Sequence, residues 1–590
     1  MKNFLKIIFG SCLGVVLAFA ALIIIGGAIG SSIASSAEKG KEVKSNSVLH
    51  LELNEVIPEQ TGNVEVDFAS FSTEKTLGLH DIVRSINAAR EDDKIKGIYL
   101  DVTSVAVGSA SASVIRDAVQ EFKDSGKFVL AYSKSYTQGG YYMASVADKV
   151  YVNPMGGVDF RGYGANLTFF KEMLDELGIK MEVFKVGTFK GAVEPFVLNE
   201  LSDANRLQIR EYINGLWNIT KEDIGASRGK SSAQLEAIAN EYGAFKADGA
   251  LATGLVDAIG YEDELLLDMS TRLGLEEDDK IQMITPKDYF PSVKKKSDFS
   301  IKDKIAVVYA EGNIVDGEGE NAQIGDRKYV DIFRKLRKND KVKAIVVRIN
   351  SGGGSAMASE NMWRELELCR AAGKPVVASM GDVAASGGYY MACASDSIFA
   401  EANTITGSIG VFGLFPITKE LMNETLHINF DSVKTSKFAA SFNPTQEMTA
   451  EEKAIFQAGT EDVYQTFMTR VKDARGFPSI EAVDKVAQGR VWTGTKALEI
   501  GLIDRFGGLQ DAIGAAAGLA GLEEYRTSEY PKQKEPLVKL MEELTGEKAN
   551  ISEKVVKAEL GDYYQYYNQL KTWKEMQGVQ AKMPFNIEIR

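Results

Sequence analysis

The stretch KVKAIVVRI, residues 341–349, repeats the pattern of KIKGIYLDV, residues 94–102. Both stretches are short, apolar and rich in β-branched or aromatic residues, which is typical of a buried strand. Two further pairs of motifs recur at almost the same offset: GGYYMA at 139–144 and 387–392, and GLVDAIG at 254–260 with GLIDRFG at 501–507. The three offsets are 247, 248 and 247 residues. Repeats in constant order and spacing predict two homologous halves.

Short strands, Gly-rich turns and helices alternate within each half. In the second half, the composition of residues 305–312, 344–349 and 375–380 is typical of strands, whereas residues 358–373 have helical spacing and end in glycine. Alternation of this kind predicts an α/β fold. A chain of 590 residues is also long enough for two such domains and flanking segments.

Four segments are predicted along the chain. They are a membrane anchor and stalk at 1–46, a first homologous domain at 47–290, a second at 300–525, and a helical extension at 526–590. The joint between the halves falls at 286–304, where two prolines and the run Lys294-Lys295-Lys296 interrupt the repeat. We expect this basic run to be a solvated linker.

The amino-terminal stretch from Ile7 to Ile29 contains 23 residues without a charge. As a helix it would span about 34 Å, enough for a bilayer core of about 30 Å. Lys2 and Lys6 precede it, so the positive-inside rule predicts a single-pass protein whose body lies on the outer, periplasmic side of the inner membrane. The alternative is a signal peptide cleaved near Ala34, but the apolar run is longer than such a signal needs.

Composition and charge exclude several classes of protein. Hydrophobic residues make up 45% of the chain and charged residues 25%, as in folded globular proteins. The net charge of −14 argues against nucleic acid as a partner. Three cysteines exclude a disulfide scaffold, and three distant histidines, His50, His80 and His427, argue against a histidine-based zinc site or a Ser-His-Asp triad. We therefore expect no metal and no cofactor.

Two strand ends in the second half carry residues suited to acyl transfer. One predicted strand runs into NSGGGS at 350–355, and the next runs into GDVAASGG at 381–388. A serine at such a strand-to-helix turn, here Ser386, can expose its hydroxyl as a nucleophile, and glycine amides can approach an oxyanion closely. Each motif alone also fits an ordinary tight turn, but two of them at successive strand ends favour a catalytic site.

The first half has lost these groups but offers a lysine. At the offset of 248 residues, Gln138 stands in the place of Ser386. Lys190 lies in the apolar stretch VGTFKGAVEPF, and the echo of this stretch in the second half has Ala439 at the equivalent position. A lysine accepts a proton only when it is neutral, so burial must lower the pKa of Lys190. The halves are complementary, and we expect neither to work alone.

At these motifs the sequence resembles a known family. AASGGYY around Ser386, TITGSIGVFG at 404–413, VGTFKGAVEPF around Lys190 and the amino-terminal anchor are similar to the long, duplicated form of signal peptide peptidase A. That family consists of Ser-Lys peptidases with a ClpP/crotonase-type fold. The resemblance implies that Ser386 is the nucleophile, that Lys190 is the general base and that Ser408 orients the lysine. It places the oxyanion hole at Gly353, Gly354 and Gly387.

The resemblance also carries expectations about substrates and assembly. It implies hydrophobic signal-peptide fragments as substrates and a homo-oligomer, a tetramer, with inward-facing sites. One departure is visible: Gly352 stands where the family usually has proline, which leaves the exact oxyanion donors open. Two alternative functions belong to other classes of protein. A crotonase-type acyl-CoA enzyme would bind CoA and need neither Lys190 nor an anchor, and a membrane-tethered scaffold would have no catalysis.

Overall fold

The structure is a computed structural model, and it describes residues 41–62, 65–67, 72–74, 76–276, 279–293, 298, 300–319, 322–533, 556, 559–561, 564, 567 and 578–583. The predicted anchor at Ile7–Ile29 and the basic run at 294–296 lie outside these residues. Within the described ranges, no helix is both long and apolar enough to cross a membrane.

The first half is built on a parallel sheet with the strand order β8-β6-β5-β4-β1-β9. Its strands are β1 (Ser47–Glu52), β4 (Ile95–Asp101), β5 (Phe128–Ser133), β6 (Lys149–Val152), β8 (Ala258–Ile259) and β9 (Gln282–Ile284). A short hairpin, β2 (Glu65–Asp67) and β3 (Ser72–Glu74), stands apart from it. The helices are α2 (Leu79–Glu91), α3 (Ser109–Asp124), α4 (Gln138–Ala144), α5 (Lys171–Glu176), η1 (Gly191–Val193), α6 (Glu194–Val197), α7 (Asp203–Arg228), α8 (Ser232–Glu241), α9 (Ala247–Ala252), α10 (Glu262–Leu273) and α11 (Pro286–Val293).

The second half contains a sheet with the path β19-β17-β15-β13-β10-β21, from which β16 and β20 branch beside β15. Its strands are β10 (Lys304–Glu311), β13 (Val342–Ser351), β15 (Val376–Ala385), β16 (Ser397–Ala400), β17 (Ile405–Gly407), β19 (Val491–Thr493), β20 (Arg505–Phe506) and β21 (Arg526–Tyr530). The helices are α12 (Asp326–Arg337), α13 (Ala356–Ala371), α14 (Gly387–Ala392), η2 (Leu421–Thr425), α15 (Ala450–Arg475), α16 (Ile480–Asp484), α17 (Gly494–Glu499) and α18 (Leu509–Leu519).

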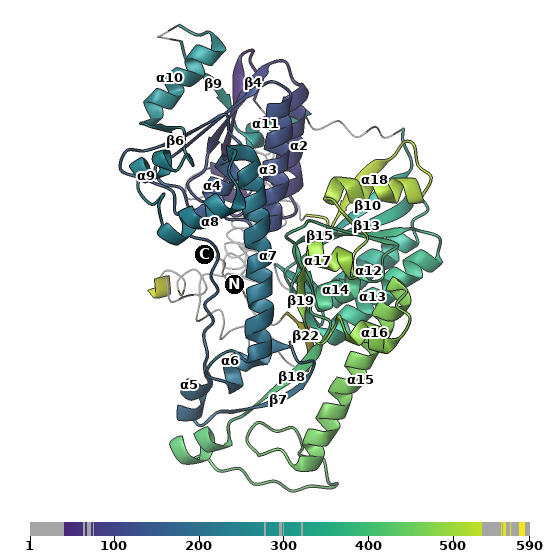
Figure 1. Cartoon of the computed structure of the whole chain (residues 1–590). Coiled ribbons are helices and arrows are strands. Elements are labelled where there is room, and N and C mark those ends of the chain that lie inside the picture. The colour runs from purple at the N-terminus through teal and green to yellow at the C-terminus, as the bar shows by residue number, and fades with distance from the viewer. Residues whose placement is uncertain are drawn as a thin grey trace, which may run out of the picture.

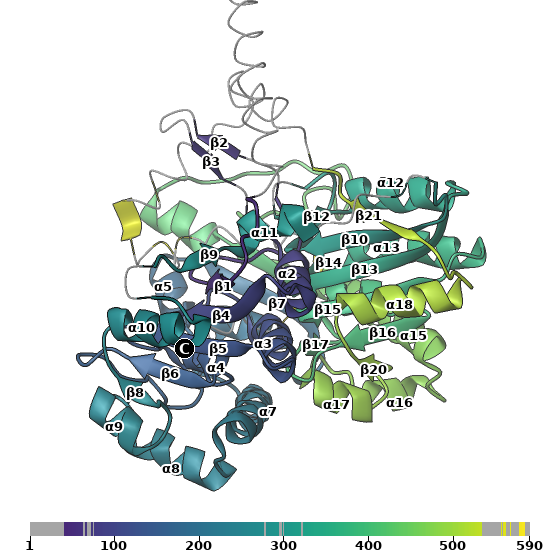
Figure 2. The same cartoon turned by 90° about the horizontal axis from the view of Figure 1, so that it is seen from above.

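The two halves repeat one plan, as the sequence predicts. The order β8-β6-β5-β4-β1-β9 has its counterpart in β20-β16-β15-β13-β10-β21. Four pairs of helices begin 247 residues apart: α2 and α12 at 79 and 326, α3 and α13 at 109 and 356, α7 and α15 at 203 and 450, and α10 and α18 at 262 and 509. Figures 1 and 2 show the first half, coloured from purple to teal, beside the second half, coloured from teal through green to yellow. The α/β fold is confirmed.

A third sheet joins the halves, in the order β12-β11-β14-β22-β18-β7. It consists of β7 (Lys180–Val186), β11 (Asn313–Val315), β12 (Gln323–Gly325), β14 (Gly353–Ser355), β18 (Val411–Ile417) and β22 (Val579–Lys582). β7 belongs to the first half and pairs antiparallel with β18 of the second, from Val186 opposite Val411 to Lys180 opposite Ile417. The two strands run together in the lower part of Figure 1. This pairing brings the residues that follow β7 to the second half.

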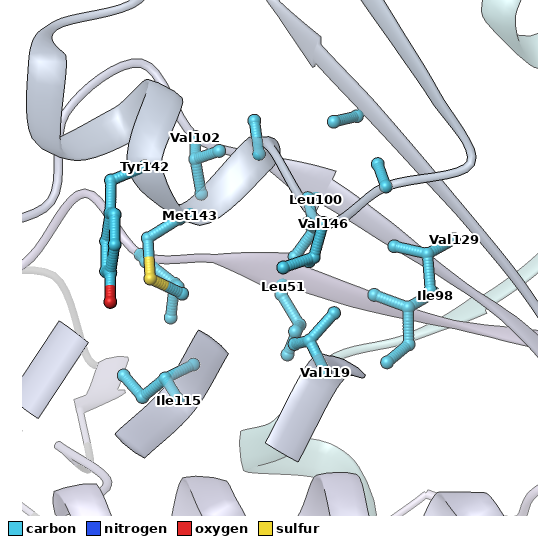
Figure 3. Packing of buried hydrophobic residues seen from close by; sticks show 14 of the residues in the cluster. Leu51, Ile98, Leu100, Val102, Ile115, Val119, Val129, Tyr142, Met143 and Val146 are labelled. Atoms are coloured by element: carbon cyan, nitrogen blue, oxygen red, sulfur yellow. The ribbon is translucent and has the colours of Figure 1, made fainter. Parts of the chain in front are cut away.

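Each half has its own apolar core. Figure 3 shows the first, where Leu51, Ile98 and Val129 from the strands meet Ile115 and Val119 of α3. These side chains are fully buried, and each contributes about 1.5–3 kcal/mol by leaving water. The second core has the same composition of Val, Ile, Leu and aromatic side chains. Smaller apolar clusters join the halves, such as the one in which Ile209 and Leu216 of α7 pack with Ile405 and Val491.

One expectation at the ends of the halves differs from the structure. The predicted joint begins with a helix, since Pro286–Val293 form α11, in which Tyr289 and Phe290 are buried against the first core, and the basic run predicted to be a solvated linker lies outside the described residues. The extension from residue 526 was expected to be helical, but Arg526–Tyr530 form β21 and pair with β10. The helical prediction is wrong there because the edge of β10 would otherwise expose unpaired backbone groups.

Candidate active site

Ser386 occupies the turn between β15 and α14, as the sequence predicts. Its φ of 55° and ψ of −114° are unusual for a residue with a Cβ. The turn is held on both sides, because the Ser386 amide donates to Gly407 O at 2.8 Å and its carbonyl accepts from Tyr390 N at 2.8 Å. The expected exposure of the hydroxyl is not seen: Ser386 is completely buried. A strained backbone fixed in this way aims the side chain in one direction.

Lys190 reaches the second half through the strand pairing of β7 with β18. Phe189 N donates to Gln488 O at 2.9 Å, which anchors the segment after β7 to the loop before β19. A Cβ added to Gly489 would lie 2.7 Å from Lys190 Cβ, whereas one added to Gly410 would make ordinary contact with Lys190 Cδ at 3.4 Å. The lysine therefore lies in a slot that the missing side chain of Gly489 leaves open.

The lysine amine lies among three neutral oxygen atoms. Lys190 Nζ is 2.8 Å from Ser386 Oγ, 3.0 Å from Ser408 Oγ and 3.2 Å from Ser408 O. Burial lowers the pKa of Lys190 well below its usual value of 10.5, because a charged ammonium would lose its hydration there. A neutral amine has two N–H donors and one lone pair. It can donate twice to Ser408 and accept the proton of Ser386.

Ser408 lies between β17 and β18 and faces the lysine with two oxygen atoms. Its φ of 49° places it in the left-handed region, and its amide donates to Arg490 O at 2.7 Å. Ser408 is fully buried, like Ser386 and Lys190. All three predicted polar groups thus meet in one place, with one from the first half and two from the second.

The predicted oxyanion glycines come together at the start of α14. Gly353 has a φ of 95°, and a Cβ on it would lie 2.6 Å from Gly387 N. Its own amide donates to Ser351 Oγ at 3.1 Å. Gly354 follows directly in β14. The amide of Gly353 is therefore already engaged, Gly387 lies beside Gly353, and Gly354 pairs with Ile314 of β11 and with Ala581 of β22.

Sequence reasoning did not identify the side chains that hold the lysine segment. Gln208 of α7 donates to Phe189 O at 2.7 Å and accepts from Val491 N at 3.2 Å, so it bridges the two halves. Asn205, one turn earlier, donates to Glu194 at 2.5 Å. Glu194 therefore fixes a loop and does not touch Ser386. Glu194 belongs to the stretch VGTFKGAVEPF, but Asn205 and Gln208 lie 15 and 18 residues after Lys190 and belong to no motif, so no sequence signal marked these two.

Other candidates lie elsewhere. Lys437, the sequence echo of the lysine region, is exposed and forms an ion pair with Glu451. His50 is in β1 and His80 begins α2, both in the first half, and His427 is in an exposed segment. Burial lowers the pKa of His80 to about 4. The hydrogen-bond partners of Ser386 within the described residues include none of the three histidines.

One group in the described part of the chain has the spacing of a metal site. Ligand atoms of His50, Glu52 and Asp101 lie within 4.8 Å of one another. They belong to β1 and β4 of the first half, and none of them contacts the Ser386–Lys190 pair. Exposed carboxylates often cluster in this way without a metal ion. That the enzyme needs no metal remains a prediction from the sequence.

The comparisons with known proteins match a segment in each half of the chain. The model of "Peptidase family S49" matches residues 121–276 and 369–523, once in each half. "Protease 4" of Salmonella typhi is 38% identical over 477 residues, which cover 79% of this chain and 76% of that protein. "Serine protease SPPA, chloroplastic" of Arabidopsis thaliana is 31% identical over 76% of this chain and 66% of its own length. "Putative signal peptide peptidase SppA" of Enterococcus faecium is 28% identical over 38% of this chain and 67% of its own length.

Proposed function

Because this chain belongs to peptidase family S49 and is a serine peptidase, we propose that it works through a Ser386–Lys190 dyad divided between its two halves. The observation that carries the proposal is the distance of 2.8 Å between Lys190 Nζ and Ser386 Oγ in a fully buried site. A serine hydroxyl becomes nucleophilic only when a base within hydrogen-bond reach takes its proton. Lys190 is that base.

The reaction has two stages, acylation and deacylation. Neutral Lys190 takes the proton of Ser386 Oγ, which attacks the peptide carbonyl and forms a tetrahedral intermediate. The C–N bond then breaks, and the Lys190 ammonium gives its proton to the leaving amine. In deacylation Lys190 takes a proton from water, hydroxide adds to the acyl carbon, and Ser386 leaves with the proton that returns from the lysine.

Ser408 and the glycine amides support this chemistry. Ser408 accepts from the lysine amine through two oxygens and so directs the remaining lone pair at Ser386. The amide of Gly387, together with the neighbouring turn of Gly353 and Gly354, holds the oxyanion. Loss of one such donor costs about 3–4 kcal/mol in the transition state of comparable enzymes.

The substrates proposed are hydrophobic signal-peptide fragments. Two observations support this: a relative bears the name of a signal peptide peptidase, and residues 7–29 of this chain could hold the body near a membrane. The enzyme is then a single-pass protein of the inner membrane with its body on the periplasmic side. Each half is a variant of the ClpP/crotonase-type fold that the sequence motifs imply.

A homotetramer is part of the same proposal. Between η2 and α15 the chain carries several large apolar side chains that are substantially exposed: Leu426, Ile428, Phe430, Val433, Phe438 and Phe442. Apolar side chains gathered in this way mark contact surfaces. Copies of this chain are the occupants that the resemblance implies, and sedimentation of the detergent-solubilised full chain measures their number.

A serine-directed phosphonate probe tests the proposed dyad. It should label wild-type enzyme at Ser386, and Ser386→Ala should lose both labelling and peptide hydrolysis while it keeps its melting temperature within a few degrees. Labelling at another serine, or wild-type turnover in Ser386→Ala, would refute the assignment. The acyl-CoA and scaffold alternatives are set aside, because the chain is a serine peptidase.

A further inference from the structure

Asp382 connects the strand that leads to the catalytic serine with a helix of the other half. It belongs to β15, four residues before Ser386. Its Oδ1 accepts from the backbone amide of Ser111 at 2.8 Å, and its Oδ2 accepts from Ser111 Oγ at 2.7 Å. Ser111 lies in the first turn of α3, so a carboxylate of the second half caps a helix of the first half. Figure 2 shows α3 beside β15 at the boundary between the halves.

The helix α3 has no cap of its own. Its N-cap residue is Gly108, which has no side chain to accept a hydrogen bond, and its first turn contains no acidic residue. A Cβ added to Gly108 would overlap the carboxylate of Asp382. The missing side chain of Gly108 thus leaves the space that Asp382 fills, at the positive end of the helix dipole, where a carboxylate is favoured.

Asn403 makes a second contact between the same two segments. Its Nδ2 donates to Ser109 O at 2.8 Å, and its side chain is buried. Asn403 lies two residues before β17, and β17 pairs with the last three residues of β15. The amino-terminal end of α3 is therefore bonded to both segments that lead to the serine turn.

β15 changes its neighbours at the position of Asp382. Residues 377–379 pair with β16, whereas residues 383–385 pair with β17. The register of β15 against β13 also shifts at this point. An irregularity of this kind bends a strand and changes the direction of the side chains after it. The bend at Asp382 therefore sets the direction in which the strand delivers Ser386.

The two neighbours of Asp382 are held within the second half. Gly381 O accepts from Thr404 Oγ1 at 2.8 Å, and Val383 N donates to Asn350 Oδ1 at 3.1 Å. The side chain of Asp382 adds the bond to the first half, which supplies the catalytic lysine. The bend before the serine is thus fixed relative to the half that carries the base.

We propose that Asp382 is a positioning residue for the reaction, which caps α3 across the interface and so holds the bend of β15 with Ser386 Oγ facing Lys190. The inference rests on the proposed dyad. Asp382 does not touch the reacting atoms, and it acts through the four residues of chain that lead to the serine. A misplacement of about 1 Å can cost about a hundredfold in rate. Asp382→Ala should therefore lower kcat about ten- to a hundredfold and leave KM near that of wild type.

A second variant separates this role from the stability of the helix. In Asp382→Ala/Gly108→Asp, an aspartate at the N-cap takes the space of the lost carboxylate and caps α3 from within the first half. Gly108 has a φ of −71° and a ψ of 170°, which an aspartate adopts without strain. The double variant should regain the melting temperature of wild type and keep the low kcat of Asp382→Ala.

Ser231→Ala is the matched control. Ser231 caps α8, and its Oγ accepts from Gln234 N at 3.3 Å, so this cap lies entirely within the first half. Its loss should lower the melting temperature by a few degrees without a change in kcat. All kcat values are measured on one peptide substrate with the full chain, at a temperature at which every variant is folded. If Asp382→Ala alone fails to fold, the double variant decides by its kcat.

Two results would overturn the positioning role. One is the kcat of wild type in Asp382→Ala, and the other is a double variant that recovers kcat together with its melting temperature. The phosphonate probe keeps these outcomes apart from the dyad. Labelling of Ser386 in the wild-type enzyme supports the dyad whatever Asp382 does, and labelling of another serine would refute the dyad itself.

Discussion

Lys190 Nζ and Ser386 Oγ lie 2.8 Å apart although 196 residues separate them in the chain. The contact exists because β7 of the first half pairs along its whole length with β18 of the second. Duplication supplied two similar units, and each has kept a different part of the site: Gln138 replaces the serine in the first half. The fragment 300–590 expressed alone should therefore be inactive.

Lys190→Arg should lose peptide hydrolysis. The guanidinium remains protonated at working pH and cannot accept the proton of Ser386. The measurement is kcat/KM on a peptide, with Lys437→Arg as the control, because Lys437 is exposed and paired with Glu451. Equal loss in both variants would mean that the effect does not come from the site.

Gly489→Ala should lower kcat about a hundredfold, because a Cβ 2.7 Å from Lys190 Cβ must displace the base. Gly501→Ala is the matched control. Gly501 has a φ of 78°, close to the 77° of Gly489, but no atom lies within 4 Å of its added Cβ. The control therefore carries the same backbone strain, about 1 kcal/mol, without the clash. If both variants keep full kcat, the glycine slot does not position the lysine.

Lys190→Met should be more stable than wild type near neutral pH, by an amount that shrinks as pH rises. In the unfolded chain the lysine titrates near its usual pKa of 10.5, and in the folded chain its pKa is well below that. Between the two values folding releases a proton, so wild-type stability rises with pH by up to about 1.4 kcal/mol per unit. Methionine has no such dependence.

Urea unfolding of Lys190→Met and wild type at pH 8, 9 and 10 measures this difference. Lys437→Met supplies the control, since that side chain is 64% exposed. A stability difference between Lys190→Met and wild type that stays constant over this range would mean that Lys190 is charged in the folded protein.

Glu59→Ala should destabilise the contact between the halves. Glu59 Oε2 accepts from Arg348 Nε at 2.8 Å, and both side chains are buried. Removal of the carboxylate leaves a buried guanidinium unpaired, which costs about 3–5 kcal/mol. Glu499→Ala breaks the exposed pair with Lys496 and should cost at most about 1 kcal/mol. Similar melting temperatures for the two variants would contradict the role assigned to Glu59.

The catalytic groups could be predicted from sequence because each has a local signature. The turn at Ser386 needs a strand, small residues and a helix start in succession, and Lys190 is conspicuous as a charge in an apolar stretch. Their contact could be inferred only because the repeat placed Ala439 at the position of the lysine. Two incomplete copies of one site imply one complete site.

The parts that could not be predicted depend on pairing between distant segments. Gln208 meets Phe189 through the packing of α7 against β19, and Gly489 is one of 55 glycines in the chain. β22 has the sequence VQAK, in which apolar and polar residues alternate over four residues only, a run too short to predict a strand by itself. It forms a strand because β14 and β18 offer it two edges.

The dependence of kcat/KM on pH tests the central claim, that Lys190 acts as a neutral base on Ser386. We predict a rise through one ionisation whose midpoint lies below the 10.5 of a free lysine, and no activity in Lys190→Arg at any pH. A profile that is flat from pH 5 to 10, or a fully active Lys190→Arg enzyme, would contradict the claim.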